Sequence, residues 1–192
     1  MKELPMKRMN IRKKKGFPLS SKKFFISGIC ILFSVFFSYF SNNVTSIGSS
    51  LCLSHIPVFV GGFLCGYPFG FFIGFFSAVL SGIFFSIPWI PDIVSAAVEL
   101  SSYGCMIGLM YHFLPKHLES IFTALIISMT TGKVLWGVSR LICSCFGFSS
   151  LTFHTFWDYT VLSCIPGILL TLFFVPFLIL AIQQVRFMNH KR

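Results

Sequence analysis

Long apolar runs alternate with short polar or turn-forming stretches along most of this chain. A helix that crosses a bilayer needs about 20 apolar residues, because each residue adds about 1.5 Å across a hydrocarbon core of about 30 Å. On this criterion the pattern predicts six spanning helices. They lie at about 23–40, two within 51–87, and at 93–114, 118–146 and 157–183.

The run from 51 to 87 is far too long for one span. As a single helix it would measure about 55 Å, which is nearly twice the hydrocarbon thickness. Its middle carries Gly66-Tyr67-Pro68-Phe69-Gly70, and glycine and proline in this arrangement are typical of a turn. We therefore expect two spans joined by a very tight turn.

The composition agrees with a membrane protein and excludes several other classes. Of 192 residues, 55% are hydrophobic and 10% charged, and the mean hydropathy is +0.85. A soluble domain has about 45–50% apolar and about 25% charged residues. The 26 Phe residues add apolar area that a chain of this size cannot hide in its own core. A soluble enzyme, a disordered chain and a secreted disulfide scaffold are excluded, and we expect an all-α integral membrane protein.

The seven cysteines suggest neither a disulfide framework nor a metal site. Their number is odd, and they are scattered through apolar segments. Cys143-x-Cys145 has no second cysteine pair and no nearby histidine, so a zinc site is not expected. We interpret the cysteines as small packing residues and expect no metal and no cofactor.

Basic residues are concentrated at the N-terminus. The net charge is +10, from 15 Lys and Arg against five Asp and Glu. Nine of the basic residues lie in the first 23 positions: Lys2, Lys7, Arg8, Arg12, Lys13, Lys14, Lys15, Lys22 and Lys23. Such a cluster can bind nucleic acid. Directly before an apolar run of membrane length, it is more typical of a cytoplasmic anchor that also contacts anionic lipid.

The loop charges predict the orientation in the membrane. With the N-terminus inside, the inner segments hold the basic cluster, Lys116, and the C-terminal Arg186, Lys191 and Arg192. The predicted outer loops contain no Lys or Arg. By the positive-inside rule, both termini are therefore expected to be cytoplasmic.

This pattern divides the chain into three parts. We expect a basic cytoplasmic tail at 1–22, a six-helix transmembrane domain at 23–183, and a short basic cytoplasmic tail at 184–192. The run 24–40 could instead be the core of a signal peptide. No small-x-small cleavage pattern follows it, so we interpret it as a retained first span.

Three ionisable residues fall inside predicted spans: Glu99, Lys133 and Arg140. Charges in a bilayer are costly and usually have a function. In the predicted topology, Glu99 and Arg140 lie at similar depths below the outer surface. Lys133 precedes Arg140 by seven residues, which places it about 10 Å deeper on the same helical face.

Polar and aromatic residues are expected close to these charges. Trp136 lies between Lys133 and Arg140 on their helical stripe, Tyr103 is one turn from Glu99, and His55 opens the second span near the outer face. We therefore expect several helices to contribute polar groups to one level in the outer half of the membrane.

Two interpretations of these charges remain open. Glu99 could pair with Arg140 or Lys133 as a structural clasp, which would leave the other cation without a carboxylate. That second cation could then face a cavity and bind an anionic ligand. His55, Tyr103 and Trp136 could be ligand contacts or ordinary packing residues.

No arrangement typical of a membrane enzyme can be placed. His112 and His117 fall at the inner end of their spans and His154 in an outer loop, so no Ser–His pair meets at one depth. The sequence contains no H-E-x-x-H motif and no nucleotide-binding motif of the G-x-x-x-x-G-K or GxGxxG type. We expect a protein that is not an enzyme, and any uphill transport would take its energy from a partner or an ion gradient.

Several motifs, in order along the chain, resemble one transporter family. They are His55-Ile56-Pro57-Val58, Gly61-Gly62, the segment from Gly66 to Gly74, Glu99-Leu100-Ser101-Ser102-Tyr103-Gly104, Thr131-Gly132-Lys133-Val134-Leu135-Trp136-Gly137, Ile165-Pro166-Gly167-Ile168 and Val175-Pro176. Together they resemble the signature of substrate-binding (S) subunits of energy-coupling factor (ECF) transporters. The subgroup resembled includes subunits for pantothenate and related vitamins.

The resemblance implies a fold and a function. It implies six helices around an outward-facing vitamin pocket, and assembly with a transmembrane coupling subunit and two cytoplasmic ATPase subunits. ATP hydrolysis would belong to those partners, and the subunit would topple in the membrane to release its vitamin. From the convergence of polar groups, we expect the substrate-binding residues to be His55, Glu99, Tyr103, Lys133, Trp136 and Arg140, and all but Arg140 lie within the motifs that resemble the family.

Two positions depart from the family pattern. Lys133 stands where the family often has Arg, which keeps the charge but loses the bidentate fork. The first helix of the family often carries an Ala-x-x-x-Ala face that docks the coupling subunit. The nearest match here is Ser34-x-x-x-Ser38, and small residues four apart still permit close helix approach.

We therefore expect a vitamin-capture subunit in a bacterial inner membrane, whose ligand is a small, anionic, pantothenate-like vitamin or precursor. Lys133 or Arg140 would meet the ligand's carboxylate, and Glu99 a hydroxyl or amide. A stand-alone secondary transporter of a small metabolite and a non-transporting membrane assembly protein remain as alternatives. Co-purification with ATPases and binding of a small molecule would separate the three.

The topology can be tested with reporter fusions. Reporters at Ser46, Pro91 and Ser150 are expected to report an outside location, and one at Lys116 an inside location, because only the inner segments carry basic residues. Alkaline phosphatase and a fluorescent protein give complementary signals. A cytoplasmic signal at Pro91 would contradict the six-span arrangement.

Overall fold

The computed structural model describes residues 21–43, 53–85, 90–114, 118–147 and 165–189. These stretches are helical and contain no strand. The helices are α1 (Ser21–Asn43), α3 (His55–Cys65), α4 (Tyr67–Phe84), α5 (Ile90–Phe113), α6 (Leu118–Cys145) and α8 (Ile165–Asn189). The all-α class expected from the sequence is confirmed for this part of the chain.

The predicted tight turn in the long apolar run is confirmed. Helix α3 ends at Cys65 and α4 begins at Tyr67, so only Gly66 separates them. Gly66 has a φ of 92°, a conformation that glycine adopts without a side-chain clash. Its N–H donates to the carbonyl of Gly62 at 3.0 Å, and its own carbonyl accepts from Gly70 at 2.9 Å. Pro68 fits the first turn of α4, where no N–H is needed.

Four helices are long and apolar enough to cross a membrane: α1, α4, α5 and α6. The first, third, fourth and fifth predicted spans thus correspond to α1, α4, α5 and α6. Helix α3 has 11 residues, about 16 Å of helix, and α8 contains a shorter apolar stretch, 167–182. The chain is a multi-pass membrane protein, whereas the number of six spans stays a prediction.

Several sequence-based expectations lie outside the described residues. They concern most of the N-terminal basic cluster, Lys116, most of the predicted outer loops, and the first eight residues of the predicted sixth span, 157–164. The cytoplasmic location of both termini and the three-part division of the chain therefore stay predictions.

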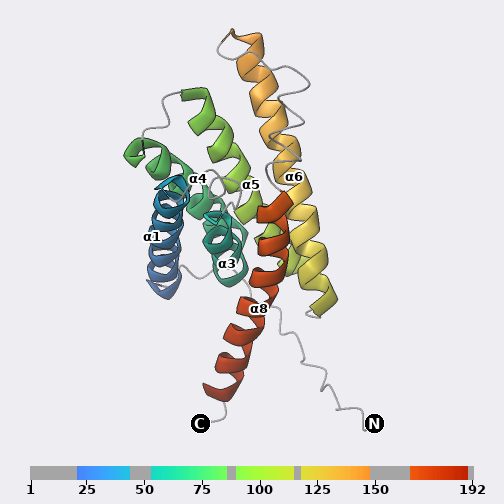
Figure 1. The fold of residues 1–192 in the computed structure, drawn as a ribbon. Coiled ribbons are helices and arrows are strands. Elements are labelled where there is room, and N and C mark those ends of the chain that lie inside the picture. The colour runs from blue at the N-terminus through green and yellow to red at the C-terminus, as the bar shows by residue number, and fades with distance from the viewer. Residues whose placement is uncertain (1–20, 44–52, 86–89, 115–117, 148–164, 190–192) are drawn as a thin grey trace.

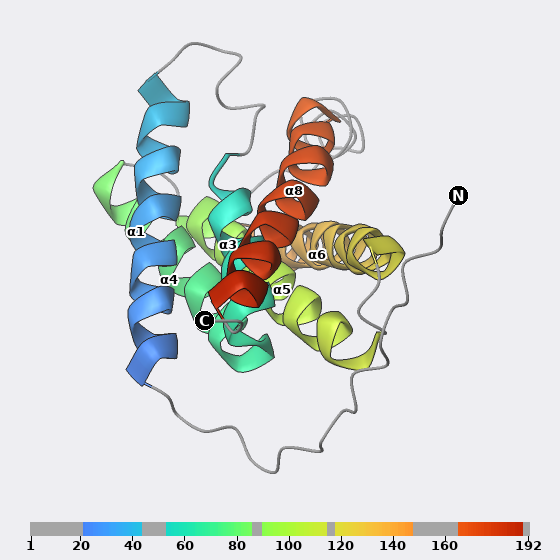
Figure 2. The ribbon, with the colours of Figure 1, turned by 90° about the horizontal axis from the view of Figure 1, so that it is seen from below.

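The helices are arranged around α3 and α5. Helices α1 and α6 lie on opposite sides of this pair, and α8 crosses between α3 and α6 (Figures 1 and 2). The centre is closely packed, with Val58 and Phe59 of α3, Ile73 of α4 and Ile107 of α5 all inaccessible. This core holds α5 in a fixed position against its neighbours.

The outer faces of the bundle are apolar. Phe25 and Leu32 of α1 are 72% and 71% exposed, and Phe72 and Phe84 of α4 are 54% and 67% exposed. Exposed aromatic faces of this extent would be unusual in water and suit contact with lipid. The many phenylalanines of the sequence are thus accommodated by the bilayer as well as by the core.

Small residues bring α4 and α5 into backbone contact. A Cβ added at Gly70 would lie 2.1 Å from the carbonyl oxygen of Gly104, and a Cβ at Gly104 would lie 2.1 Å from that of Gly70. One turn along, a Cβ at Gly74 would lie 2.1 Å from the carbonyl oxygen of Leu100. Close approach through small residues is a common basis of helix association in membranes, and here it fixes the position of Glu99, next to Leu100.

Gly70→Ala tests this contact. The added methyl group meets backbone, which cannot move aside as a side chain can, so we expect a loss of stability of about 1–3 kcal/mol, as for other overpacked sites. Thermal unfolding of the purified protein in detergent measures it. Gly28→Ala in α1 is the matched control, because a Cβ there has no neighbour within 4 Å. Equal melting temperatures for the two variants would contradict the proposed contact.

Candidate functional site

Three side chains from three helices meet at the carboxylate of Glu99. The Lys133 ammonium of α6 lies 2.7 Å from Glu99 Oε1, and His55 Nε2 of α3 lies 3.8 Å from the same oxygen. The Tyr103 hydroxyl, one turn along α5, donates to Oε1 at 2.6 Å. Glu99 is 6% exposed and Tyr103 is 1% exposed. The expected convergence of polar groups from different helices is confirmed for these four residues.

The surrounding residues shape this cluster by steric fit. A Cβ at Gly132 would lie 2.2 Å from Cε1 of Tyr103, so the glycine lets the Tyr103 ring lie directly against α6. The rings of His55 and Phe59 are each centred 5.2 Å from that of Tyr103. Tyr103 is thus held between α3 and α6, with its hydroxyl fixed on Glu99.

Arg140 has a different partner from the expected one. Its guanidinium lies 2.5 Å from the carboxylate of Asp92, in the first turn of α5. The expectation that either Lys133 or Arg140 has no carboxylate partner is therefore wrong. The fourth span is predicted to begin at residue 93, which leaves Asp92 in the loop before it. Helix α5 instead begins at Ile90, so Asp92 is a helical residue within reach of Arg140.

Trp136 lies between the two cations, as the helical spacing predicts. Lys133 Nζ is 5.8 Å from the centre of its ring, and the Arg140 guanidinium carbon is 5.5 Å from it. Both distances are within the range of cation–π attraction. The indole therefore lies between the Glu99–Lys133 pair, whose side chains are 8% and 18% exposed, and the Asp92–Arg140 pair, whose side chains are 37% and 22% exposed.

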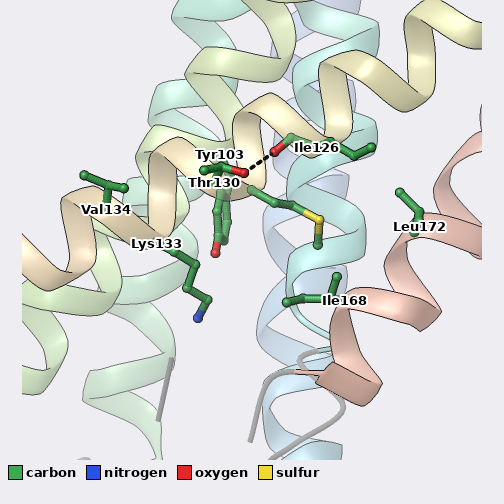
Figure 3. Close-up of a pocket in the computed structure, with 8 residues that line it drawn as sticks. Tyr103, Ile126, Thr130, Lys133, Val134, Ile168 and Leu172 are labelled. Carbon is green, nitrogen blue, oxygen red and sulfur yellow. Dashed lines mark hydrogen bonds between the residues drawn. The ribbon is translucent and has the colours of Figure 1, made fainter. Parts of the chain in front are cut away.

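A cavity lies beside Lys133, between α6 and α8. Its volume is about 370 Å³, and its walls are formed by Tyr103, Ile126, Met129, Thr130, Lys133, Val134, Ile168 and Leu172. Lys133 and Tyr103 point toward the same space, and Ile168 and Leu172 of α8 face it from the opposite side (Figure 3). A volume of this size is within the range of small-molecule sites.

The polar cluster itself leaves almost no space. A void of about 10 Å³ lies among His55, Tyr103, Lys133 and the start of α8, which is room for at most one water molecule. Tyr103, Met129, Lys133 and Ile168 line both this void and the larger cavity. The Lys133 side chain is thus shared between a closed ion pair and an open apolar space.

Sequence reasoning missed most of the cavity wall. The wall residues of α6 are spaced by three, four, seven and eight residues: Ile126, Met129, Thr130, Lys133 and Val134. This is the repeat of one helical face, so the stripe through Lys133 carried the signal. Ile168 lies in one of the motifs that resemble the transporter family, but no signal identified Leu172, because the approach of both residues to the cavity depends on how α8 crosses the bundle.

The predicted docking residues of α1 differ in burial. Ser34 is inaccessible, and its hydroxyl donates to the carbonyl of Ser54 at 2.9 Å. It therefore faces α3 of the same chain and cannot contact another subunit in this arrangement. Ser38, one turn along, is half-buried. A role of the Ser34 and Ser38 face in docking stays a prediction. A substitution at Ser38 can test it without disturbing the hydrogen bond of Ser34.

The two ion pairs allow a test of their structural roles. Lys133→Met and Glu99→Gln each remove one member of a buried pair, so each is expected to destabilise by about 3–5 kcal/mol. The double variant is expected to regain much of this loss, because no buried charge remains. Melting temperatures of the four proteins complete the cycle.

Asp92→Asn and Arg140→Gln are the matched control pair on the same two helices. Asp92 is 37% exposed and lies in the first turn of α5, so each substitution is expected to cost less than its counterpart in the Glu99–Lys133 pair. If the losses of stability from Glu99→Gln and Lys133→Met simply add up in the variant that carries both, the Glu99–Lys133 pair is not coupled and this interpretation is wrong.

Comparison with known proteins gives one match. A family model described as "ECF transporter, substrate-specific component" matches residues 22–189, which is most of the chain. No curated protein and no solved structure matches the chain significantly.

Proposed function

Because the chain belongs to the family of ECF transporter substrate-specific components, we propose that it captures a small anionic vitamin or vitamin precursor from the outer side of a bacterial inner membrane. Members of this family are vitamin-binding transporter subunits and not enzymes. Our proposal adds to the family membership that the ligand is anionic, that it is captured from the outer side, and that the membrane is bacterial.

The observation that carries this proposal is the position of Lys133 at a cavity wall. Its ammonium lies in the membrane part of the protein, next to an apolar cavity of about 370 Å³. Such cavities bind small molecules through a few well-placed polar groups, and an intramembrane charge facing a cavity is a common feature of substrate sites. We propose Lys133 as the contact for the ligand's anionic group, with Tyr103 beside it.

The other predicted site residues have supporting roles in this proposal. Glu99 holds Lys133 at 2.7 Å, and His55 lies against Glu99. Trp136 and Arg140 are separate from the cavity wall, and Arg140 is engaged by Asp92. We therefore propose that His55, Glu99, Trp136 and Arg140 act on the ligand through Lys133, by fixing its side chain.

The proposed energy source is a partner. The sequence contains no nucleotide-binding motif, and ECF modules in general supply ATP hydrolysis to the subunits of this family. We propose assembly with a transmembrane coupling subunit and two ATPase subunits, with the coupling subunit contacting α1 near Ser38. The exposed apolar side chains of α1, including Phe25 and Leu32, offer surface for another membrane helix.

Two measurements on the affinity-purified protein test this function. A panel of vitamins is screened by thermal shift, and one member is expected to raise the melting temperature, since a ligand at 100 times its Kd stabilises by about 2.7 kcal/mol. ATPase subunits are expected to co-purify from the native membrane, and less so with Ser38→Leu. Binding without ATPases would indicate a secondary transporter, and neither binding nor ATPases a non-transporting assembly protein.

A further inference from the structure

Building on the function proposed above, we propose that the ligand of this site is a carboxylate with a mainly apolar body, which lies in the cavity between α6 and α8 with its carboxylate at Lys133. This differs from the hydroxylated acid that the pantothenate-type motifs imply. The chemistry of the cavity wall carries the distinction.

The wall offers one charge and much apolar surface. Ile126, Met129, Val134, Ile168 and Leu172 are aliphatic or thioether side chains, and Lys133 is the charged residue among the eight that line the cavity. An apolar body gains from contact with the aliphatic wall, by about 0.8 kcal/mol for each methylene that leaves water, which corresponds to about fourfold in affinity.

The polar groups of the wall already take part in hydrogen bonds within the protein. Thr130 donates its hydroxyl hydrogen to the carbonyl of Ile126 at 2.8 Å, a bond visible in Figure 3. Tyr103 donates its hydroxyl hydrogen to Glu99 at 2.6 Å. A ligand with several hydroxyl groups would find few partners for them here, and a buried polar group without a partner weakens binding.

The carboxylate is placed by Lys133. An ammonium has three N–H donors, and Glu99 accepts from it at 2.7 Å. A ligand carboxylate entering the cavity would approach the same ammonium from the α8 side. The two carboxylates would then share one cation, so Glu99 is a competitor of the ligand as well as the group that positions Lys133.

The opening of the cavity suits an amphipathic molecule. Ile126 and Val134 at its edge are 54% and 59% exposed on the outer face of α6, whereas Tyr103 at its inner wall is 1% exposed. The cavity is thus closed toward the core and open between α6 and α8. A molecule with an apolar body can occupy such a space with its body toward lipid and its charge toward the core.

Binding of simple carboxylates to the full-length protein in lipid nanodiscs tests the inference, with empty nanodiscs as the blank. Octanoate is expected to bind about 15-fold more tightly than hexanoate, at about fourfold for each added methylene. Gluconate has the six carbons of hexanoate but carries hydroxyl groups, and it is expected to bind at least tenfold more weakly. 1-Octanol, which lacks the charge, is expected to bind at least tenfold more weakly than octanoate.

Variants separate this cavity from general partition into apolar grooves. Lys133→Met is expected to remove the preference for octanoate over 1-octanol. Ile168→Trp fills the cavity and is expected to abolish binding of both molecules. Phe76→Trp is the matched control, since Phe76 lines a separate groove between α1 and α4, and it is expected to change nothing.

Two outcomes would overturn the inference. Gluconate binding as tightly as hexanoate would show that the site accepts hydroxylated bodies. Equal binding of octanoate and 1-octanol, unaffected by Lys133→Met, would show a groove for acyl chains without charge recognition. A polar vitamin bound through Lys133 would refute this ligand class and leave the transporter function standing. The expected octanoate pattern without co-purifying ATPases would support the ligand class and refute the proposed assembly with ATPase subunits.

Discussion

A carboxylate buried in the membrane part of the protein is the constraint on which the site depends. Glu99 is 6% exposed, and an ionised group in such a place is stable only when it is paired and hydrogen-bonded. Lys133 and Tyr103 both bond to it at less than 3 Å. The pairing with Glu99 holds Lys133 at the wall of the cavity, so the position of the proposed ligand contact follows from the need to neutralise Glu99.

The helix packing makes this arrangement possible. The backbone contact of Gly70 with Gly104 brings α4 against α5 on one side, and Gly132 lets Tyr103 lie against α6 on the other. In a bilayer, where apolar side chains gain little by leaving lipid, such close packing and interhelical polar bonds supply the attraction between helices. Glycines and two ion pairs together hold α5 at the centre of the bundle.

Much of this could be predicted from the sequence, because it depends on local signals. The cluster of Gly66, Pro68 and Gly70 marks a turn in an apolar run too long for one span, and the seven-residue spacing of Lys133 and Arg140 places both on one face with Trp136 between them. The partner of Arg140 could not be predicted in this way. Asp92 is 48 positions away, and its contact depends on where α5 begins and on how α5 and α6 cross, which no spacing within one helix contains. The approach of Ile168 and Leu172 to the cavity is of the same long-range kind.

The two ion pairs and the cavity share Lys133 but involve different neighbours of α6. Both pairs join α6 to α5, whereas the wall contributed by α8 consists of Ile168 and Leu172, and the nearby hydroxyl of Thr171 donates to Gly167 within α8 itself. Movement of α8 away from α6 would therefore separate aliphatic surfaces and leave both pairs of opposite charges intact. Because lipid tails can replace those aliphatic contacts at little cost, the cavity has a wall that can open without the work of pulling charges apart in a medium of low dielectric constant.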